Sequence, residues 1–295
     1  MKKTTPLQRL NHPLFDAHQI RVWIKRDDLN HPIIQGNKLH KLRLNVEKAK
    51  RLNKTQLLSF GGAYSNHLLA VAAAAKENGL YSIGYVRGDE LADNHQAWSP
   101  TLKQAASFGM ELRFLDRQTY RNRNHQAWLE LVQQQNPNAY ILPEGGSNDL
   151  AVEGVAELAE QLMQQCPTFT HLLCAVGSGG TLAGLAKHLP GDKSVLGIAC
   201  LKQADYLRDR IEGWMGYNKQ NWRLLTEFHG GGFGKSNRQI EHQATQFEQD
   251  FNLLLDPVYT AKVVWSFYQL LAQNEFAPGS EIILYHSGGL QGRQD

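Results

Sequence analysis

The sequence predicts an α/β protein built on parallel sheets, and three observations support this fold class. Short runs rich in β-branched and aromatic residues alternate along the chain with longer amphipathic or alanine-rich stretches. Several of the short runs lead directly into glycine clusters, as expected where a parallel strand ends and a helix follows. No internal repeat, low-complexity tract or long linker interrupts this order. Such an alternation favours a parallel sheet covered by helices on both faces.

The individual elements follow from these runs. The expected strands are Val22–Lys25, Gln56–Phe60, Tyr81–Val86, Glu111–Leu115, Tyr140–Leu142, His171–Val176, Val195–Cys200 and Glu281–His286. The expected helices include Leu39–Arg51, Ser65–Asn78, Leu150–Gln165 and Asp256–Gln273. Four of the strands fall between residues 51 and 145, which predicts a small α/β domain inserted into a larger one made of residues 1–50 and 146–295.

Composition excludes several classes of function. The 31 Lys and Arg against 28 Asp and Glu leave a net charge of only +3, which argues against a dedicated nucleic-acid or membrane-surface binder. No apolar run approaches the ~20 residues of a spanning helix, and none follows Lys2 and Lys3 as in a signal peptide. The three cysteines lack CxxC spacing, and the twelve histidines show no HExxH motif. We therefore expect a cytoplasmic protein without a metal site.

The stretch Gly36-Asn37-Lys38-Leu39-His40-Lys41 opens a helical pattern and is the first candidate for chemistry. A lysine buried near other cations loses its proton more easily and becomes a nucleophile that can form a Schiff base with a carbonyl cofactor. An ordinary solvated turn explains the tripeptide Gly-Asn-Lys equally well, so the stretch gains weight only from the rest of the chain.

Two glycine clusters precede predicted helices in the first half of the chain. The first, Phe60–His67, includes Ser65 and Asn66 as natural N-caps, where free backbone N–H groups can receive a carboxylate. The second, Glu144–Asp149, is the turn Glu-Gly-Gly-Ser-Asn-Asp. A capped turn without further function accounts for either cluster.

Two more clusters follow in the second half. The run Gly177-Ser178-Gly179-Gly180-Thr181 lets the backbone approach an oxyanion at the positive end of the next helix. It is no Walker A loop, and Leu182 occupies the third glycine position of GxGxxG, so a phosphate monoester is favoured over ATP or NAD. In Tyr285–Leu290, Ser287 presents a hydroxyl either to a ring nitrogen or to its own loop.

Two other segments are weaker candidates. The glycine-rich run His229–Gly234 is either a mobile loop that closes over a site or a surface hairpin. Tyr259 and Thr260 follow Asp256-Pro257 at a predicted helix start, where a capping role alone explains the aspartate.

Six motifs in this order, GNKxxK, GGxxSNH, GGSN, GSGGT, DPVYT and HSGG, span the chain from about Lys25 to Gly289. In this order they resemble the pyridoxal-phosphate (PLP) enzymes that include D-cysteine desulfhydrase and 1-aminocyclopropane-1-carboxylate deaminase. The resemblance implies a two-domain, parallel-sheet fold of the tryptophan-synthase β-subunit type (fold type II), with the cofactor between a large and a small domain. It also implies a small amino acid as substrate and a homodimer.

The resemblance assigns roles to particular residues. Lys38 would form the Schiff base with the cofactor, Asn37 would lie near the ring hydroxyl, and Tyr259 would stand beside the Schiff base. The remaining assignments concern the phosphate (Lys41 with the loop Gly177, Ser178, Gly179, Gly180 and Thr181), the substrate (Ser65, Asn66 and His67) and the pyridine nitrogen (Thr260 and Ser287).

The chain departs from the deaminase pattern at positions that bear on the reaction. That pattern has glutamate where Thr260 stands and leucine where Ser287 stands, whereas the desulfhydrase pattern prefers a hydroxyl at both. Gln35 replaces a glycine that is common in the family before Gly-Asn-Lys, and the chain is somewhat short for the family. Neutral hydroxyls leave the ring nitrogen largely unprotonated, and such a shallower electron sink suits loss of a good β-leaving group more than opening of a cyclopropane. We therefore favour β-elimination giving a 2-oxo acid and ammonia.

Three other functions stay open. The first is an amino-acid racemase, with Ser65 or Tyr259 as the second acid/base. Another is a nucleotide-dependent oxidoreductase, disfavoured by the incomplete GxGxxG. The last is a catalytically silent amino-acid binder, against which the joint presence of Lys38, Ser65 and Tyr259 argues.

Overall fold

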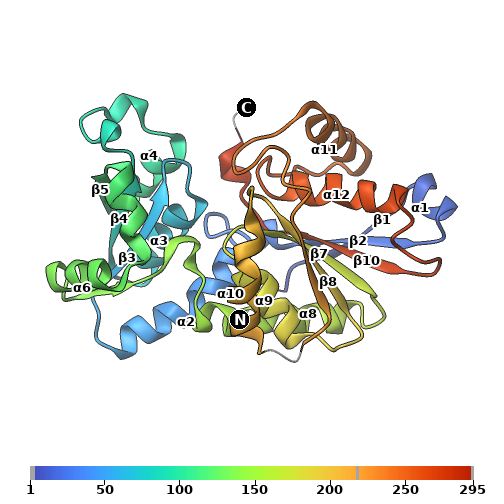
Figure 1. Cartoon of the computed structure of the whole chain (residues 1–295), viewed down its shortest axis with the longest axis horizontal. Helices are drawn as coiled ribbons and strands as arrows, with labels where there is room; N and C mark the ends of the chain where they lie inside the picture. Colours follow the sequence, from blue (N-terminus) through green and yellow to red (C-terminus); the bar gives the residue numbers. More distant parts are fainter. Residues whose placement is uncertain (1–3, 217–218, 294–295) are drawn as a thin grey trace. The chain divides into compact units, whose positions relative to one another are not determined.

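The computed structural model describes residues 4–216 and 219–293, and the chain divides into two compact units (Figure 1). The first unit comprises Met1–Asn37 and Val155–Asp295, and the second comprises Lys38–Gly154. The predicted small domain, residues 51–145, lies within the second unit.

The first unit is built on a six-stranded sheet in the order β1-β2-β10-β7-β8-β9. Only the edge strand β1 is antiparallel, pairing with β2, and all other neighbours run parallel. Every residue of the central strand β10 is buried. The strands are β1 (Leu7–Leu10), β2 (Arg21–Arg26), β7 (His171–Val176), β8 (Ser194–Ala199), β9 (Trp222–Leu225) and β10 (Glu281–His286).

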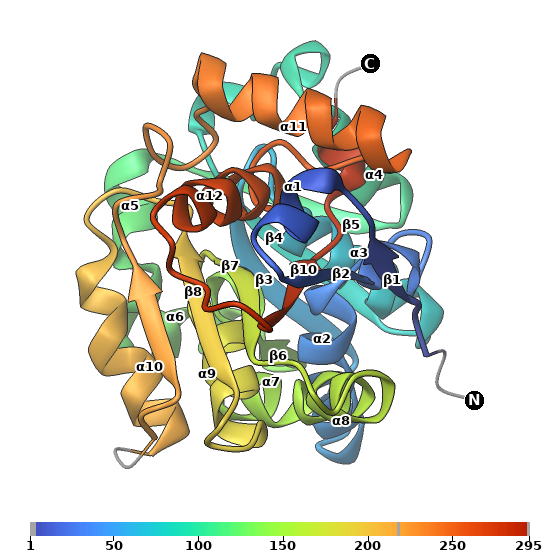
Figure 2. The same ribbon diagram turned by 90° about the vertical axis from the view of Figure 1, so that its right-hand side faces the viewer.

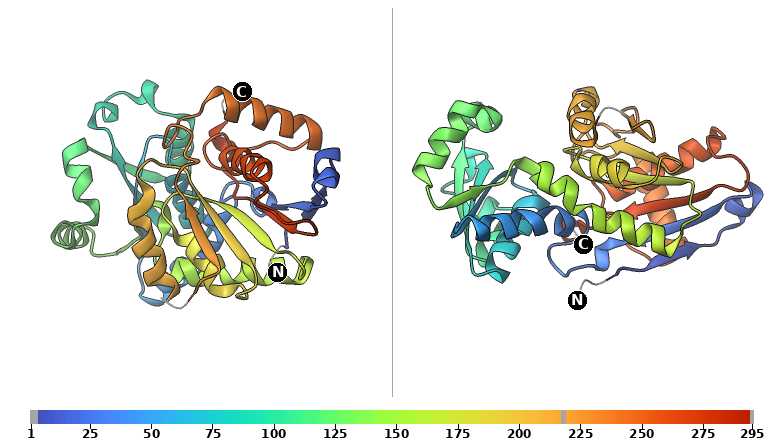
Figure 3. Two further views of the ribbon diagram at one scale, coloured as in Figure 1. Left: turned by 45° about the vertical axis from the view of Figure 1, so that its right-hand side comes forward. Right: turned by 90° about the horizontal axis from the view of Figure 1, so that it is seen from below.

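Helices cover both faces of this sheet. α11 and α12 lie on one face, and α8 and α9 lie on the other, as the two turned views show (Figures 2 and 3). The core between α12 and the sheet is apolar, with Val263, Phe267, Ile282 and Leu284 all fully buried. The helices of this unit are α1 (Pro13–Ala17), α8 (Ala156–Gln165), α9 (Gly180–His188), α10 (Leu207–Met215), α11 (Arg238–Phe251) and α12 (Thr260–Ala272).

The second unit is built on a four-stranded parallel sheet in the order β5-β4-β3-β6. The alanine-rich helix α3 packs on β3 and β4, and its small side chains allow a close approach to the strands. The strands are β3 (Gln56–Gly62), β4 (Tyr81–Arg87), β5 (Met110–Leu115) and β6 (Ala139–Ile141). The helices are α2 (Asn37–Arg51, whose first residue belongs to the other unit), α3 (Asn66–Glu77), α4 (Pro100–Ser107), α5 (Arg117–Arg121), α6 (Gln126–Gln135) and α7 (Asp149–Gly154).

The structure differs from the predicted elements at two helices. The stretch predicted as one helix, Leu150–Gln165, forms α7 and α8 with a break at Val155. The last residue of α7, Gly154, lies so close to α2 that an added Cβ would be 2.2 Å from the carbonyl oxygen of His40. Helix α12 begins at Thr260 and not at Asp256, because the Asp256 carboxylate accepts hydrogen bonds from the backbone N–H groups ahead of the helix.

Within the described residues, none of the helices combines the length and the apolar character that crossing a bilayer requires. The same part of the chain contains no group of three or more His, Cys, Asp or Glu side chains placed to hold a metal ion. All three cysteines are buried and free.

Lys25 on β2 is a fully buried cation, and it makes the stability of the protein depend on pH. Its Nζ donates to the Thr5 carbonyl oxygen (2.9 Å) and to the Oε1 atoms of Gln161 and Gln165 (both 2.8 Å). Burial lowers the pKa of Lys25 from 10.5 to about 8, although the charge of Asp27 opposes the shift.

The sign of this pH dependence follows from the two pKa values. Below about pH 8 the lysine is protonated in both states, and between about 8 and 10.5 only the unfolded chain keeps the proton. The free energy of unfolding contributed by this lysine therefore rises with pH across that window. Urea denaturation of wild type and Lys25→Met should show that the variant loses this rise. Lys103→Met, at an exposed lysine, should keep it; equal slopes in all three proteins would contradict the assignment.

Candidate active site

The loop before α2 is held tightly against the end of β10. The Asn30 side chain hydrogen-bonds to both backbone groups of Gly36. The Gly36 N–H donates to Asn30 Oδ1, and Asn30 Nδ2 donates to the Gly36 carbonyl (both 2.9 Å). Gly36 has a φ of +63°, and an added Cβ would lie 1.7 Å from the Ser287 carbonyl oxygen. Only glycine fits here. Helix α2 thus starts, at Asn37, beside the loop that carries Ser287, and Lys38 is the next residue of the chain.

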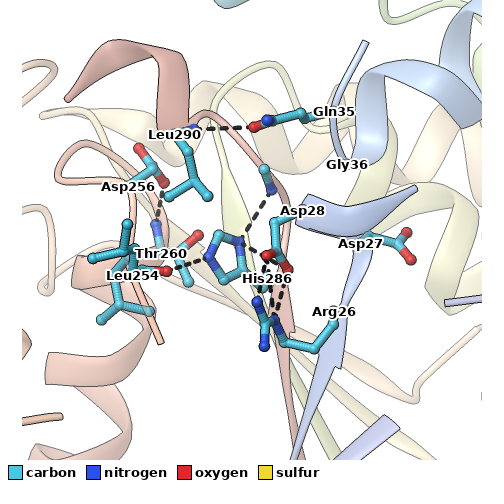
Figure 4. Close-up of polar contacts among 12 residues, drawn as sticks. Arg26, Asp27, Asp28, Gln35, Gly36, Leu254, Asp256, Thr260, His286 and Leu290 are labelled. Carbon is cyan, nitrogen blue, oxygen red and sulfur yellow. Dashed lines mark hydrogen bonds and ion pairs between the residues drawn. The ribbon is translucent and has the colours of Figure 1, made fainter. Parts of the chain in front are cut away.

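Gln35 stands where a glycine is common in the family, and its side chain has a structural role in this loop. Its Oε1 accepts hydrogen bonds from the backbone N–H groups of Gly289 and Leu290 (both 3.2 Å; Figure 4). A glycine could not provide this acceptor. The side chain therefore ties the segment before Lys38 to the segment after Ser287.

The glycine-rich loop between β7 and α9 contains Gly177, Ser178 and Gly179, and α9 begins with Gly180 and Thr181. Gly179, at the helix N-cap, has a φ of 90°, and no side chain caps the helix there. The Asn37 side-chain amide donates to Thr181 Oγ1 at 2.8 Å, so the residue before Lys38 contacts the first turn of α9. The backbone N–H groups at the start of a helix are a common site for an anion.

Tyr259 lies next to this loop, and the backbone N–H groups of Tyr259 and Thr260 are held by Asp256. An added Cβ on Gly177 would be in van der Waals contact with the Tyr259 ring, at 3.6 Å from Cε1. The Asp256 carboxylate accepts from the N–H groups of Val258 (2.9 Å), Tyr259 (3.0 Å) and Thr260 (2.7 Å). The Thr260 hydroxyl is fully buried and lacks a hydrogen-bond partner among the described residues. A buried hydroxyl without a hydrogen-bond partner costs free energy unless a ligand bonds to it.

The run His229–Gly234 forms turns without strand pairing, so it is a loop and not a hairpin. A buried lysine that the sequence analysis did not single out, Lys262, donates to the carbonyl oxygens of Gly232 (2.8 Å) and Cys200 (3.2 Å). The exposed Phe233 packs edge-on against Tyr259 with 6.1 Å between ring centroids. The loop is therefore anchored beside Tyr259.

In the second unit, the predicted substrate residues gather at the start of α3. Ser65 caps this helix, and its Oγ accepts from the Leu68 N–H at 3.2 Å. The His67 ring lies 2.8 Å from Ser59 Oγ, which also contacts the Leu142 carbonyl at 3.0 Å. Because that carbonyl takes the serine proton, Nε2 of His67 must be the donor toward Ser59. The Asn66 Oδ1 and His67 Nδ1 atoms are buried without a partner in the described residues.

Lys41 is fully enclosed in the same unit. Its Nζ donates to Ser147 Oγ at 2.8 Å and to the Gly145 carbonyl, so the second glycine cluster contributes to its environment. Burial first, and then the charge of Lys38, hold the pKa of Lys41 well below its usual value. Burial together with the charges of Lys38 and Lys41 likewise lowers the pKa of His67, which stays neutral at pH 7. The phosphate-binding role of Lys41 remains a prediction.

A family model described as pyridoxal-phosphate dependent enzyme matches residues 2–288. The chain belongs to this family. A putative 1-aminocyclopropane-1-carboxylate deaminase of Thermotoga maritima is 27% identical to this PLP enzyme and covers 98% of it and 95% of its own length. A mitochondrial bifunctional D-cysteine desulfhydrase/1-aminocyclopropane-1-carboxylate deaminase of Arabidopsis thaliana is 26% identical, covering 99% of this chain and 77% of its own.

Solved structures agree with this family. The crystal structure of an ACC deaminase homologue superposes with a TM-score of 0.82 at 26% identity, over 98% of this chain and 90% of that one. The fold predicted from the motifs, that of a type II PLP enzyme, is thereby confirmed, as is the cofactor.

Residues of this PLP enzyme fit the cofactor on two structural observations. The start of α9 follows a glycine-rich loop and has no side-chain cap at Gly179, an arrangement that suits a phosphate ester. The buried hydroxyl of Thr260, in need of a partner, suits a neutral ring nitrogen. The roles of Lys38, Asn37 and Ser287 toward the cofactor remain predictions.

Proposed function

We propose that this enzyme catalyses β-elimination from a small amino acid, as a D-cysteine desulfhydrase does, and releases a 2-oxo acid and ammonia. The observation that carries the proposal is the buried hydroxyl of Thr260, directly after Tyr259, which has no hydrogen-bond partner among residues 4–216 and 219–293. A carboxylate at this position would keep the cofactor's ring nitrogen protonated, whereas a hydroxyl offers only a neutral hydrogen bond. The name of the Arabidopsis relative, which includes D-cysteine desulfhydrase, supports the same reaction class.

The chain's own residues divide the work of this reaction. PLP, when bound, supplies the electron sink that stabilises negative charge at the substrate's α-carbon. Lys38 would hold the cofactor covalently, and its amine, when free, would take the proton from the substrate's α-carbon. The backbone N–H groups at the start of α3, behind Ser65, receive the substrate carboxylate. Tyr259 lies beside the glycine-rich loop that contains Gly177, and we assign its hydroxyl a role in proton transfer.

With cysteine as substrate, the balance is simple. The α C–H and β C–S bonds break, hydrogen sulfide leaves with a proton, and one water molecule hydrolyses the remaining imine to the 2-oxo acid and ammonia. Substrates with a poor leaving group should react slowly, because the Thr260 hydroxyl itself carries no negative charge that would deepen the electron sink.

The alternative that the relatives favour is deamination of 1-aminocyclopropane-1-carboxylate, which the names of both curated relatives include. We expect the purified enzyme to release ammonia, a 2-oxo acid and sulfide from D-cysteine faster than it releases ammonia from the cyclopropane substrate. A parallel assay with L-cysteine shows which enantiomer the enzyme prefers, and one with D-serine shows how strongly the rate depends on the leaving group. Turnover of the cyclopropane alone would reverse the ranking, and racemisation without ammonia would point to the racemase.

We also propose that the enzyme acts in the cytoplasm as a homodimer. The buried, unpaired state of all three cysteines suits a reducing compartment. The homodimer rests on the family resemblance alone, and light scattering after size-exclusion chromatography tests it.

A further inference from the structure

His286 is the last residue of β10 and is completely buried. Its Nε2 lies 2.8 Å from the carbonyl oxygen of Leu254 (Figure 4). A carbonyl oxygen can only accept, so Nε2 carries the ring proton. Its Nδ1 lies 3.2 Å from the backbone N–H of Gly288, which can only donate. Both contacts together require a neutral ring protonated at Nε2.

A charged neighbour leaves this arrangement intact. A carboxylate oxygen, Asp28 Oδ1, is 3.9 Å from His286 Nδ1, beyond hydrogen-bond distance. Asp28 is itself paired with Arg26, whose Nε and Nη2 donate to it at 2.9 and 2.7 Å. The carboxylate is thus neutralised from the other side, and the imidazole keeps its lone pair for Gly288.

The two backbone groups that His286 binds belong to the two segments proposed to face the cofactor ring. Leu254 precedes Asp256, whose carboxylate holds the N–H groups of Tyr259 and Thr260. Gly288 follows Ser287 directly. A single imidazole therefore connects the segment that carries the orphan hydroxyl of Thr260 with the loop that carries Ser287.

We propose that His286 is a positioning residue that sets the placement of the Thr260 and Ser287 hydroxyls for the cofactor's ring nitrogen, through its bonds to Leu254 and Gly288. This inference rests on the proposed roles of those two hydroxyls. Gln35 and Gly36 hold the Ser287 loop independently of His286. Loss of the imidazole should therefore shift the loop that carries Ser287 without unfolding it.

Three substitutions separate the two bonds. His286→Asn keeps an acceptor near the position of Nδ1, His286→Gln places an amide donor near that of Nε2, and His286→Leu removes both. We expect His286→Leu to lower kcat by about 10²-fold, the effect of misplacing reacting groups by about 1 Å, with a smaller change in KM. The absorbance maximum of bound PLP should shift with it, and the two amide variants should recover part of both. His242→Leu, at an exposed histidine of α11, should change neither.

A second measurement uses the protein without cofactor. In nitrogen-15 NMR of histidine-labelled apoenzyme, the histidine resonance that disappears in His286→Asn should be that of a neutral ring in the Nε2–H form. Observation of the Nδ1–H form, or an unchanged kcat and absorbance maximum in folded His286→Leu and His286→Asn, would overturn the inference. A wild type that binds PLP but turns over neither D-cysteine nor the cyclopropane refutes the proposed function instead, and the absorbance shift still decides the role of His286.

Discussion

Replacing Lys38 with alanine is expected to abolish covalent attachment of PLP and to reduce turnover by about 10²- to 10⁴-fold, the usual contribution of a positioned acid/base. The physical reason is that one amine has two tasks, holding the cofactor and removing the α-proton, which no neighbour can take over. Lys41, one helical turn further along α2, is an alternative amine, but its Nζ is buried and occupied by Ser147 and the Gly145 carbonyl. Absorbance spectra before and after borohydride, followed by mass spectrometry, measure the attachment directly.

Lys48→Ala is the matched control, because this lysine lies on the same helix α2 and its loss removes the same charge from a partly exposed position. It should retain cofactor, borohydride-stable mass increase and turnover. If Lys38→Ala still acquires that mass increase, another amine carries the cofactor and the assignment of Lys38 is wrong.

The sequence was most informative where strands lead into glycine clusters. Each such junction, after β3, β7 and β10, turned out to lie at the carboxyl end of a parallel strand, because buried parallel strands are continuous apolar runs that stand out. The polar residues at these ends could therefore be placed before any coordinates. The edge strands β1 and β9 were not predicted, since each of them is only four residues long.

Contacts between distant segments could not be predicted from the sequence. The hydrogen bonds of Gln35 to Gly289 and Leu290 join positions more than 250 residues apart, and nothing in the local pattern announces them. Ser59 reads as a strand residue, although its hydroxyl fixes the protonated nitrogen of His67. Lys262 likewise lies in an apolar helical stretch, and its role became visible only through the carbonyl groups around it. Such residues act through partners that the fold brings to them.

Gly36→Ala tests the packing on which the start of α2 depends. The new Cβ would lie 1.7 Å from the Ser287 carbonyl oxygen and 2.7 Å from the Gly288 nitrogen, both backbone atoms that cannot rotate away. The positive φ of +63° adds strain. The φ strain costs about 1–2 kcal/mol and overpacking about 1–3 kcal/mol, so we expect the free energy of unfolding to fall by roughly 2–5 kcal/mol. Urea denaturation of the apoenzyme measures this loss.

Gly79→Ala separates the two contributions, because Gly79 has nearly the same φ, +67°, with nothing within 4 Å of an added Cβ. It should lose only the cost of the φ strain, about 1–2 kcal/mol, and keep full PLP binding. Gly36→Ala should also bind PLP more weakly. The added Cβ would displace Ser287 and Gly288, and it would also shift position 36 itself, which directly precedes Asn37 and Lys38. Equal destabilisation of the two variants would mean that the loop before α2 yields freely, and the close approach of Gly36 to Ser287 would then not determine where Lys38 is placed.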